Sequence, residues 1–450
     1  MATFERRCVD WALALAEANP RAATGILDAI GAFYLASGHL KEALELSDRK
    51  RDHPIPFLRR VAVAFARSGD QSSARAVEAK IKANHHPPLW EVLAEVEVEL
   101  GSVEDAGEYC DRIEDPDERA ESFANTAVRA HDMRSGTDVR YLLEKAVVSA
   151  LAIPDSEDRL LRLISVCGAC GRASLPAVGL YAAGTLEDPP RRAEALAELA
   201  YEFSRVERGT GALALANQAL LLIFDATPVS GDQTPLIANL VRAFAWSNDE
   251  QKVRILLEGL GSDQSVPQLM AEVASIYYQQ GLSSAGIILR EALRAATVMS
   301  IGLNPVARAA IEMNALDVAF DALTVPVEDR WRNQGRIERL IDLACAYADR
   351  NDRVNALEVL ALLISVARKS DGDRELLVRR AGIACVRLGN AAEGLRMLAE
   401  VHEGPEMGDA YWRAETLFLL QEAYRALGRE PSAPELEVIR AGIAGVPARA

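Results

Sequence analysis

The sequence predicts an all-α protein built from stacked antiparallel helix pairs. One sequence unit recurs every thirty to forty residues or so, a period typical of repeat arrays. Two copies are nearly identical, IEDPDERAE at 113–121 and LEDPPRRAE at 186–194, which start 73 residues apart. Apolar residues recur at helical spacing, and no alternating strand pattern rises above them. Because one such unit cannot bury its own apolar face, the units must stack.

The repeating unit is clearest in the first third of the chain. Gly38, Gly69 and Gly101 each end an apolar run and each precede an alanine by five residues. We expect the glycine to end a first helix in the left-handed conformation, and the alanine to lie on a second helix where two backbones approach closely. The alanines are Ala43, Ala74 and Ala106, and small residues stand seven positions before each glycine at Gly31, Ala62 and Ala94. Each unit is therefore predicted to be an antiparallel helix pair.

Counting these units along the chain predicts a right-handed α-solenoid of about 11 to 12 repeats. From near residue 120 onward, long and short second helices are expected to alternate, so the true period there becomes a double repeat of about 70 to 77 residues. Small residues mark this period at spacings of 73, 74 and 70 residues, at Ala127, Ala200, Ala274 and Ala344.

The pattern divides the chain into four expected segments. Residues 1–24 form an N-terminal capping helix, and residues 25–119 form regular repeats. Residues 120–433 form double repeats with alternating long and short second helices, and residues 434–450 form a C-terminal capping helix and tail.

Helix starts are marked by Asp-Pro pairs. Asp115-Pro116 and Asp188-Pro189 place a side-chain acceptor in front of a proline at the first helical position. Proline is tolerated there because that N–H has no intrahelical partner. We interpret both aspartates as helix caps rather than as parts of a functional site.

This pattern resembles the tetratricopeptide repeat family over about residues 25–433. The similarity is strongest at LDAIGAFYLASGHLKEAL, FLRRVAVAFARSGDQSSA, WEVLAEVEVELGSVEDA, MAEVASIYYQQG and LIDLACAYADRNDRVNA, and Trp90 stands where the family has its opening tryptophan. The resemblance implies a solenoid that binds proteins or peptides. The later units are longer than the family's, the closing proline is mostly absent, and the unit at 303–323 is short. The family's two-carboxylate clamp of Lys and Asn has no counterpart here, so a chaperone C-terminal tail is not the expected ligand.

Composition and charge indicate an acidic, well-ordered protein. The 450 residues are 50% hydrophobic and carry a formal net charge of −16. That charge argues against a general nucleic-acid binder, because affinity for nucleic acid comes mainly from neutralising phosphates. Asp10 and Glu17 interrupt the first apolar stretch, so it lacks the unbroken core of a signal peptide. The longest apolar runs, 211–224 and 356–367, are too short to span a membrane. A cytoplasmic location without membrane contact is expected.

The six cysteines are predicted to be packing thiols. They are Cys8, Cys110, Cys167, Cys170, Cys345 and Cys385, and most stand where other units have small apolar residues. The CxxC at Cys167 and Cys170 lies mid-helix and has no second ligand pair. Loop histidines His53, His85 and His86 precede prolines and are expected to be solvated. Neither a metal site nor a cofactor is predicted.

Searches for catalytic motifs find none. The chain has no phosphate-binding GxxxxGK loop, no HExxH, no GxSxG and no GxGxxG after a strand. We therefore expect a protein that is not an enzyme.

The predicted partner-binding strip lies on three consecutive first helices. It pairs Tyr201 with Arg205, Arg242 with Trp246, and Tyr278 with Gln279. Residues three or four apart share a helix face, and Tyr, Trp and Arg are the most frequent interface anchors. The alternative is that Trp246 and Tyr278 only pack against the adjoining unit.

Three functions are compatible with these observations. The leading one is a non-catalytic scaffold or adaptor that binds a protein or an extended peptide on the concave face of the superhelix. The alternative is a regulatory module that senses a ligand or peptide, and the second alternative is an enzyme with an unrecognised site. The expected partners are proteins or peptides, not nucleic acid or membrane, and the oligomeric state stays open.

Overall fold

The computed structural model describes residues 3–47, 55–84, 89–133, 139–207, 209–225, 233–261, 263–325, 330–369, 374–402 and 409–445. Within them the chain forms 25 α-helices and no strand. The first thirteen are α1 (Thr3–Ala18), α2 (Ala23–Ala36), α3 (Leu40–Ser47), α4 (Ile55–Arg67), α5 (Gln71–Asn84), α6 (Trp90–Glu99), α7 (Val103–Asp111), α8 (Pro116–Asp132), α9 (Val139–Leu151), α10 (Ser156–Arg172), α11 (Pro176–Gly184), α12 (Pro189–Val206) and α13 (Thr210–Asp225). The others are α14 (Thr234–Trp246), α15 (Glu250–Leu260), α16 (Val266–Gln279), α17 (Ala285–Met299), α18 (Leu303–Glu312), α19 (Leu316–Thr324), α20 (Arg330–Asp349), α21 (Arg353–Lys369), α22 (Arg374–Arg387), α23 (Ala391–Val401), α24 (Asp409–Ala426) and α25 (Ala433–Val438), followed by a π-helical turn, Ile439–Ile443. The prediction of an all-α helix-pair repeat is confirmed.

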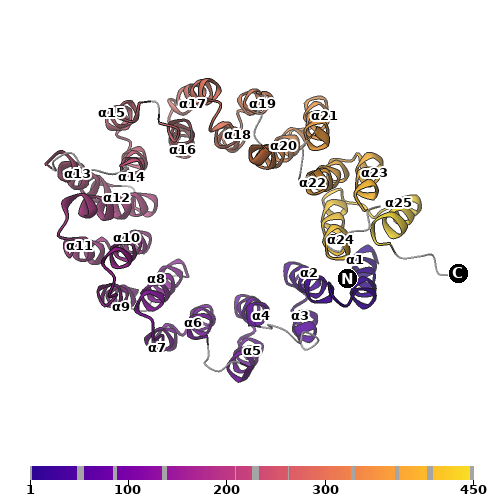
Figure 1. Ribbon diagram of the computed structural model, residues 1–450, viewed down its shortest axis with the longest axis horizontal. Helices are drawn as coiled ribbons and strands as arrows, with labels where there is room; N and C mark the ends of the chain where they lie inside the picture. The colour runs from indigo at the N-terminus through magenta and orange to yellow at the C-terminus, as the bar shows by residue number, and fades with distance from the viewer. Residues whose placement is uncertain are drawn as a thin grey trace. The chain divides into compact units, whose positions relative to one another are not determined.

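The chain forms two compact units. Unit 1 contains Met1–Val61 and Ala296–Ala450, and unit 2 contains Ala62–Ala295. In unit 2, first helices pack against the second helices that follow them in the pairs α6–α7, α8–α9, α10–α11, α12–α13 and α14–α15. Successive first helices also pack against one another along α8, α10, α12 and α14 (Figure 1). We call α4, α6, α8, α10, α12, α14 and α16 the first-helix layer.

A left-handed residue ends most first helices, as the glycine pattern predicts. Gly38, Gly69 and Gly101 have φ values of 77°, 83° and 81°. At each, the N–H of the next residue bonds to the carbonyl five residues earlier, as from His39 to Tyr34 at 2.8 Å. This is the Schellman ending that glycine favours. Later units use other residues at positive φ in the same place, including Ser174, Asn248, Gly281, Asn314, Asn351, Gly389 and Gly428.

Second helices alternate in length as the double repeat predicts. From α9 to α23 they contain 13, 9, 16, 11, 15, 9, 17 and 11 residues.

Small residues lie where helices approach closely. Ala43, Ala74 and Ala106 are fully buried. In unit 1 the backbones of α22 and α23 nearly touch, because a Cβ added to Gly394 would lie 2.5 Å from the carbonyl oxygen of Gly382. The expected close approach of two backbones is confirmed at Gly382 and Gly394, whereas the three alanines are shown only to be buried.

The predicted aspartate caps are present. The Asp115 carboxylate accepts hydrogen bonds from the N–H groups of Asp117 and Glu118 at 2.8 and 3.0 Å. Asp188 accepts one from the Arg191 N–H at 3.4 Å. Carboxylates at helix N-termini satisfy unpaired donors and complement the helix dipole. Both residues act as structural caps.

Within unit 1, the first helices of the chain pack against α24. The rings of Phe33 on α2 and Phe418 on α24 are stacked with centroids 4.5 Å apart. Phe4 on α1 meets Tyr424 edge to face at 5.6 Å. These side chains belong to one buried apolar cluster drawn from α1, α2 and α24, among other elements. Residues from both ends of the sequence therefore share a core.

Candidate functional site

Tyr201, Arg205 and Arg242 come together on the first-helix layer of unit 2. The guanidinium carbons of Arg205 and Arg242 lie 5.7 and 5.5 Å from the centroid of the Tyr201 ring. Tyr201 is partly exposed on α12, Arg205 stands one turn further along the same helix, and Arg242 comes from α14. Burial raises the pKa of the Tyr201 hydroxyl against the opposing effect of the two arginines. This part of the predicted strip is assembled as expected.

Glu202 holds two arginines in place beside Tyr201. It is buried, and its carboxylate accepts hydrogen bonds from Nη1 of Arg172 and Nη1 of Arg205, both at 3.0 Å. Arg172 is the last residue of α10, so this bond joins two successive first helices. Burying a carboxylate is costly unless it is paired, and here it is paired twice.

The same arrangement occurs nearer the start of unit 2. Arg67 at the end of α4 donates from Nε and Nη2 to the two carboxylate oxygens of Glu99 on α6, at 3.1 and 2.8 Å. Arg129 on α8 donates from Nε to Glu99 at 2.5 Å and from Nη1 to Glu95 at 2.8 Å. Glu99 is buried, and these arginine bonds lower its pKa although burial works to raise it. A buried glutamate between two arginines is therefore a repeated feature.

Arg242 continues the series toward α16. Its Nε donates to Glu272 on α16 at 2.7 Å, and its Nη1 donates to Asn239 at 2.9 Å. Asn239 in turn donates to Glu198 on α12 at 2.6 Å. Burial and the nearby Glu202 raise the pKa of Glu198. We call Arg67, Arg129, Arg172, Arg205 and Arg242 the arginine row.

The other predicted strip residues are placed differently. Trp246 is partly buried at the end of α14, and its carbonyl accepts a hydrogen bond from the Gln280 amide at 3.3 Å. Tyr278 and Gln279 are exposed on α16, whereas the neighbouring Tyr277 is fully buried. In the described part of the chain, no hydrogen bond, ion pair or ring contact joins Tyr278 or Gln279 to Tyr201. Their assignment as binding residues stays a prediction.

Sequence reasoning missed Arg67, Arg129, Arg172 and Glu202. The three arginines stand in the last turn of a first helix, as Arg205 does. Basic residues are favoured there by the helix dipole. Gly69 marks the position of Arg67, two residues before it, whereas no comparable signal in the sequence marks the other three residues.

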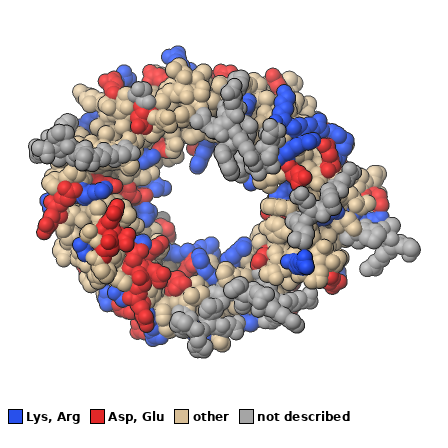
Figure 2. Space-filling model, in the orientation of Figure 1, with Lys and Arg blue, Asp and Glu red and all other residues tan. Residues whose placement is uncertain are grey.

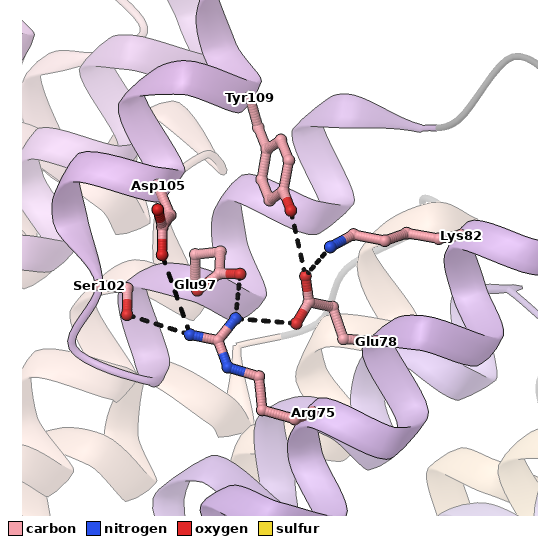
Figure 3. Close-up of polar contacts among 7 residues, drawn as sticks. All are labelled: Arg75, Glu78, Lys82, Glu97, Ser102, Asp105 and Tyr109. Carbon is pink, nitrogen blue, oxygen red and sulfur yellow. Dashed lines mark hydrogen bonds and ion pairs between the residues drawn. The ribbon is translucent and has the colours of Figure 1, made fainter.

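A second polar cluster lies between α5, α6 and α7 (Figure 3). Glu78 on α5 accepts hydrogen bonds from Lys82 at 2.6 Å, Arg75 at 2.9 Å and Tyr109 at 3.3 Å. Arg75 also bonds to Glu97 on α6, and both glutamates are buried. Burial and then the contact with Glu78 raise the pKa of Glu97 to about 7, against the effect of Arg75. For Glu78, the bonds from Lys82, Arg75 and Glu97 outweigh burial and lower the pKa.

A hollow of about 300 Å³ lies beside this cluster. The rings of Trp90 and Tyr109 stack in its wall with centroids 5.7 Å apart. The Arg112 guanidinium lies 5.0 Å from the centre of Trp90, and the Lys82 ammonium lies 5.0 Å from the centre of Tyr109. Asp105 and Glu108 complete the wall. Trp90, which marks the family resemblance in sequence, thus contributes to a stacked aromatic and cationic cluster.

The cysteines lie in the packed interior. Cys8, Cys110, Cys167, Cys170 and Cys385 are buried, Cys345 is partly buried, and all six are free thiols. Burial raises the pKa of Cys167 well above its ordinary value and that of Cys170 to about 12. Thiols with raised pKa are poor nucleophiles and poor metal ligands. The geometry therefore favours packing at the CxxC.

Metal-binding and membrane-spanning features are absent from the described residues. No group of three or more His, Cys, Asp or Glu side chains among them is arranged to hold a metal ion. None of the helices in those ranges combines the length and apolar character needed to cross a membrane. His53, His85 and His86, which the sequence placed in solvated loops, lie outside the described residues.

Acidic side chains of unit 2 gather over α7 to α10 in the face shown by Figure 2. The first turns of α8 and α10 carry Asp117, Glu118, Glu157 and Asp158. The arginine row stands toward the other end of the first helices, in the last turn for four of its five members. The first-helix layer is thus acidic at the N-terminal ends of these helices and rich in arginine toward the C-terminal ends.

Comparisons with known proteins add little to this description. No family model and no curated protein matches the chain. A crystal structure of Ton1535 from Thermococcus onnurineus NA1 is 16% identical with a TM-score of 0.26, covering 72% of this chain and 97% of that one. A circular tandem repeat protein with novel repeat topology and enhanced subunit contact surfaces is 15% identical with a TM-score of 0.17, covering 98% and 96%. Scores this low do not establish a shared fold, so the chain is described by its own geometry, as an all-α protein of stacked helix pairs.

Proposed function

We propose that this protein is a non-catalytic scaffold that binds a protein or an extended peptide along the first-helix layer of unit 2, as a tetratricopeptide-like repeat protein. The observation that carries the proposal is Tyr201, a partly exposed ring held between Arg205 and Arg242 on successive first helices. Tyr and Arg are enriched among the residues that dominate binding energies at interfaces.

The architecture supports an elongated ligand. Stacked repeats offer a series of equivalent positions along one layer, and an extended segment can contact several of them at once. Rows of side chains fixed by buried partners lose little entropy on binding, which increases affinity. The Glu202 clamp fixes Arg172 and Arg205 in this way.

A cytoplasmic location is part of the proposal. The six free thiols, five of them buried, are compatible with a reducing compartment, where disulfides are rare.

Photo-crosslinking from the layer tests the proposal. A benzophenone amino acid replaces Tyr201, and in a control it replaces Tyr181, which is exposed on α11 in the second-helix layer. Crosslinked proteins from a cell lysate are then identified by mass spectrometry. We expect the variant at position 201 to capture a specific partner that excess unmodified protein competes away, and the variant at position 181 not to capture it. Equal capture at both positions, or none at 201, contradicts a binding role for this layer.

A further inference from the structure

At the Glu99 and Glu202 clamps, the arginines are more exposed than the carboxylates that pair with them. The Arg205 side chain is 49% exposed and that of Arg172 is 38% exposed, whereas the Glu202 side chain between them is 8% exposed. At the other clamp, Arg67 is 60% exposed and Glu99 is 4% exposed. A ligand that approaches these positions therefore meets guanidinium groups, although each is paired with a carboxylate beneath it.

These guanidinium groups keep hydrogen-bond donors for a ligand. An arginine has five N–H donors in a planar fork. Arg172 and Arg205 each use Nη1 on Glu202, and their remaining donors bond to nothing else in the described residues. Fixed planar donors of this kind recognise carboxylates in two-point contacts.

The N-terminal ends of α8 and α10 disfavour an acidic ligand. The chain carries a net charge of −16, and the first turns of α8 and α10 are acidic. Like charges across an interface suppress binding at the wrong place. An acidic segment is consequently directed to the C-terminal part of the first-helix layer, where the arginines stand.

We propose that the arginine row binds an acidic segment of an extended polypeptide, with side-chain carboxylates on Arg172 and Arg205. This inference rests on the proposed function and names the chemistry of the partner. The two arginines stand on the consecutive first helices α10 and α12. Packed helices lie about 8–10 Å apart, and an extended chain of the polyproline II type advances about 3.1 Å per residue with about three residues per turn, so every third side chain lies on one face. The matching ligand therefore carries an acidic residue at every third position.

Fluorescence anisotropy with a labelled peptide tests this inference. The probe is a twelve-residue peptide of Gly-Glu-Ser repeats, in which every third residue is acidic. Its comparison peptide has the same composition with the glutamates in one block. We expect the spaced peptide to bind more tightly than the blocked one, and raising the salt concentration to weaken binding. Equal affinity for both peptides overturns the predicted register.

Variants of the Glu202 clamp give opposite expectations for a binding role and a structural role. Arg172→Gln and Arg205→Gln are combined with Glu202→Gln, so that no unpaired carboxylate stays buried. This triple variant should raise the Kd for the spaced peptide by about tenfold or more, because each of the two substituted arginines no longer donates a charged hydrogen bond to the peptide. Glu202→Gln alone should weaken binding much less than the triple variant, because both arginines keep their charge although they lose the carboxylate that fixes them. A loss of affinity in Glu202→Gln alone that equals the loss in the triple variant contradicts the proposal.

A charge-matched control separates local contact from net charge. Arg140 on α9 pairs with Glu144 on the same helix at 2.8 Å, and both side chains are exposed. Arg140→Gln should leave the Kd for the spaced peptide unchanged.

Two further probes test the class of the partner: a Gly-Lys-Ser peptide and a single-stranded oligonucleotide. Neither probe should bind at the arginine row, so the triple variant should not lower the affinity for either of them. If the oligonucleotide binds there, the acidic polypeptide is the wrong partner class. If the benzophenone variant at position 201 captures a partner but no acidic peptide binds, the inference that the partner is acidic is wrong and the proposed function stands.

Discussion

At the scale of single residues, buried carboxylates determine where the cations of unit 2 stand. Glu99 and Glu202 lie beneath exposed arginines, and Glu97 lies beside Arg75. A buried carboxylate needs a partner because its desolvation is costly. Sequence reasoning found Tyr201, Arg205 and Arg242 because residues at helical spacing share a face. It missed Glu202 because no local pattern distinguishes a buried glutamate from the many exposed ones.

Glu97 should make the stability of the protein depend on pH. Its pKa is raised to about 7 in the folded state, so the folded state binds the proton more tightly than the unfolded chain. The contribution of Glu97 to the free energy of unfolding is therefore greatest below pH 4.5 and decreases as pH rises toward 7. The lowered pKa of Glu78 acts only below its ordinary value of 4.5 and leaves this window unaffected.

Glu97→Gln should remove this loss of stability with rising pH. Between pH 5 and 8 the variant should gain up to about 3 kcal/mol relative to the wild type, at about 1.4 kcal/mol for each unit of pKa. Urea unfolding at a series of pH values measures the difference, and Glu144→Gln, an exposed carboxylate on α9, serves as the control. Parallel stability curves for wild type and Glu97→Gln contradict a buried, protonated Glu97.

At the scale of helices, the sequence predicted the elements well where the chemistry is local. Gly38, Gly69 and Gly101 end helices because glycine adopts positive φ without strain, and Asp115 caps α8 with its carboxylate. Ser174 is less recognisable, because non-glycine residues at positive φ are uncommon and carry no clear signature. The pairing of a first helix with the second helix that follows it was also predicted, whereas the packing of α1 and α2 against α24 was not.

The contact between α22 and α23 should tolerate only glycine. Gly394→Ala places a Cβ against the backbone of Gly382, which cannot rotate away, so it should destabilise unit 1 by about 1–3 kcal/mol. Gly259→Ala is the matched control, since Gly259 is exposed on α15 with nothing within 4 Å of the added carbon. It should stabilise the protein by about 0.5–1 kcal/mol through helix propensity. Thermal unfolding of both variants measures these changes in stability. Equal unfolding temperatures for the two variants would contradict the close approach of the α22 and α23 backbones.

At the scale of the whole chain, residues from the two ends of the sequence share one core in unit 1. The pattern predicted capping helices at 1–24 and 434–450, and their capping role stays a prediction. It contained no signal that α1 and α2 pack against α24, because helical periodicity identifies an apolar face but not the distant face that covers it.

A double-mutant cycle tests this contact. Phe33 and Phe418 are buried with stacked rings, so each change to alanine should cost about 3–5 kcal/mol. If the rings touch, the double variant should lose less than the sum by about 0.5–1.5 kcal/mol, the coupling of an aromatic pair. Chemical unfolding measures all four proteins. Strict additivity means that the two rings pack on different neighbours.

The most direct test of the central claim is the affinity of a partner, identified by crosslinking at position 201, for the variant Trp246→Ala. Trp246 is partly buried on α14, four residues after Arg242. Titration calorimetry should show a loss of at least about 2 kcal/mol of binding free energy, with the protein still folded. Trp412→Ala, which changes an exposed tryptophan on α24 of unit 1, should leave the affinity unchanged. Unchanged affinity for Trp246→Ala together with a lower unfolding temperature would assign Trp246 to packing and contradict the predicted strip that pairs Arg242 with Trp246.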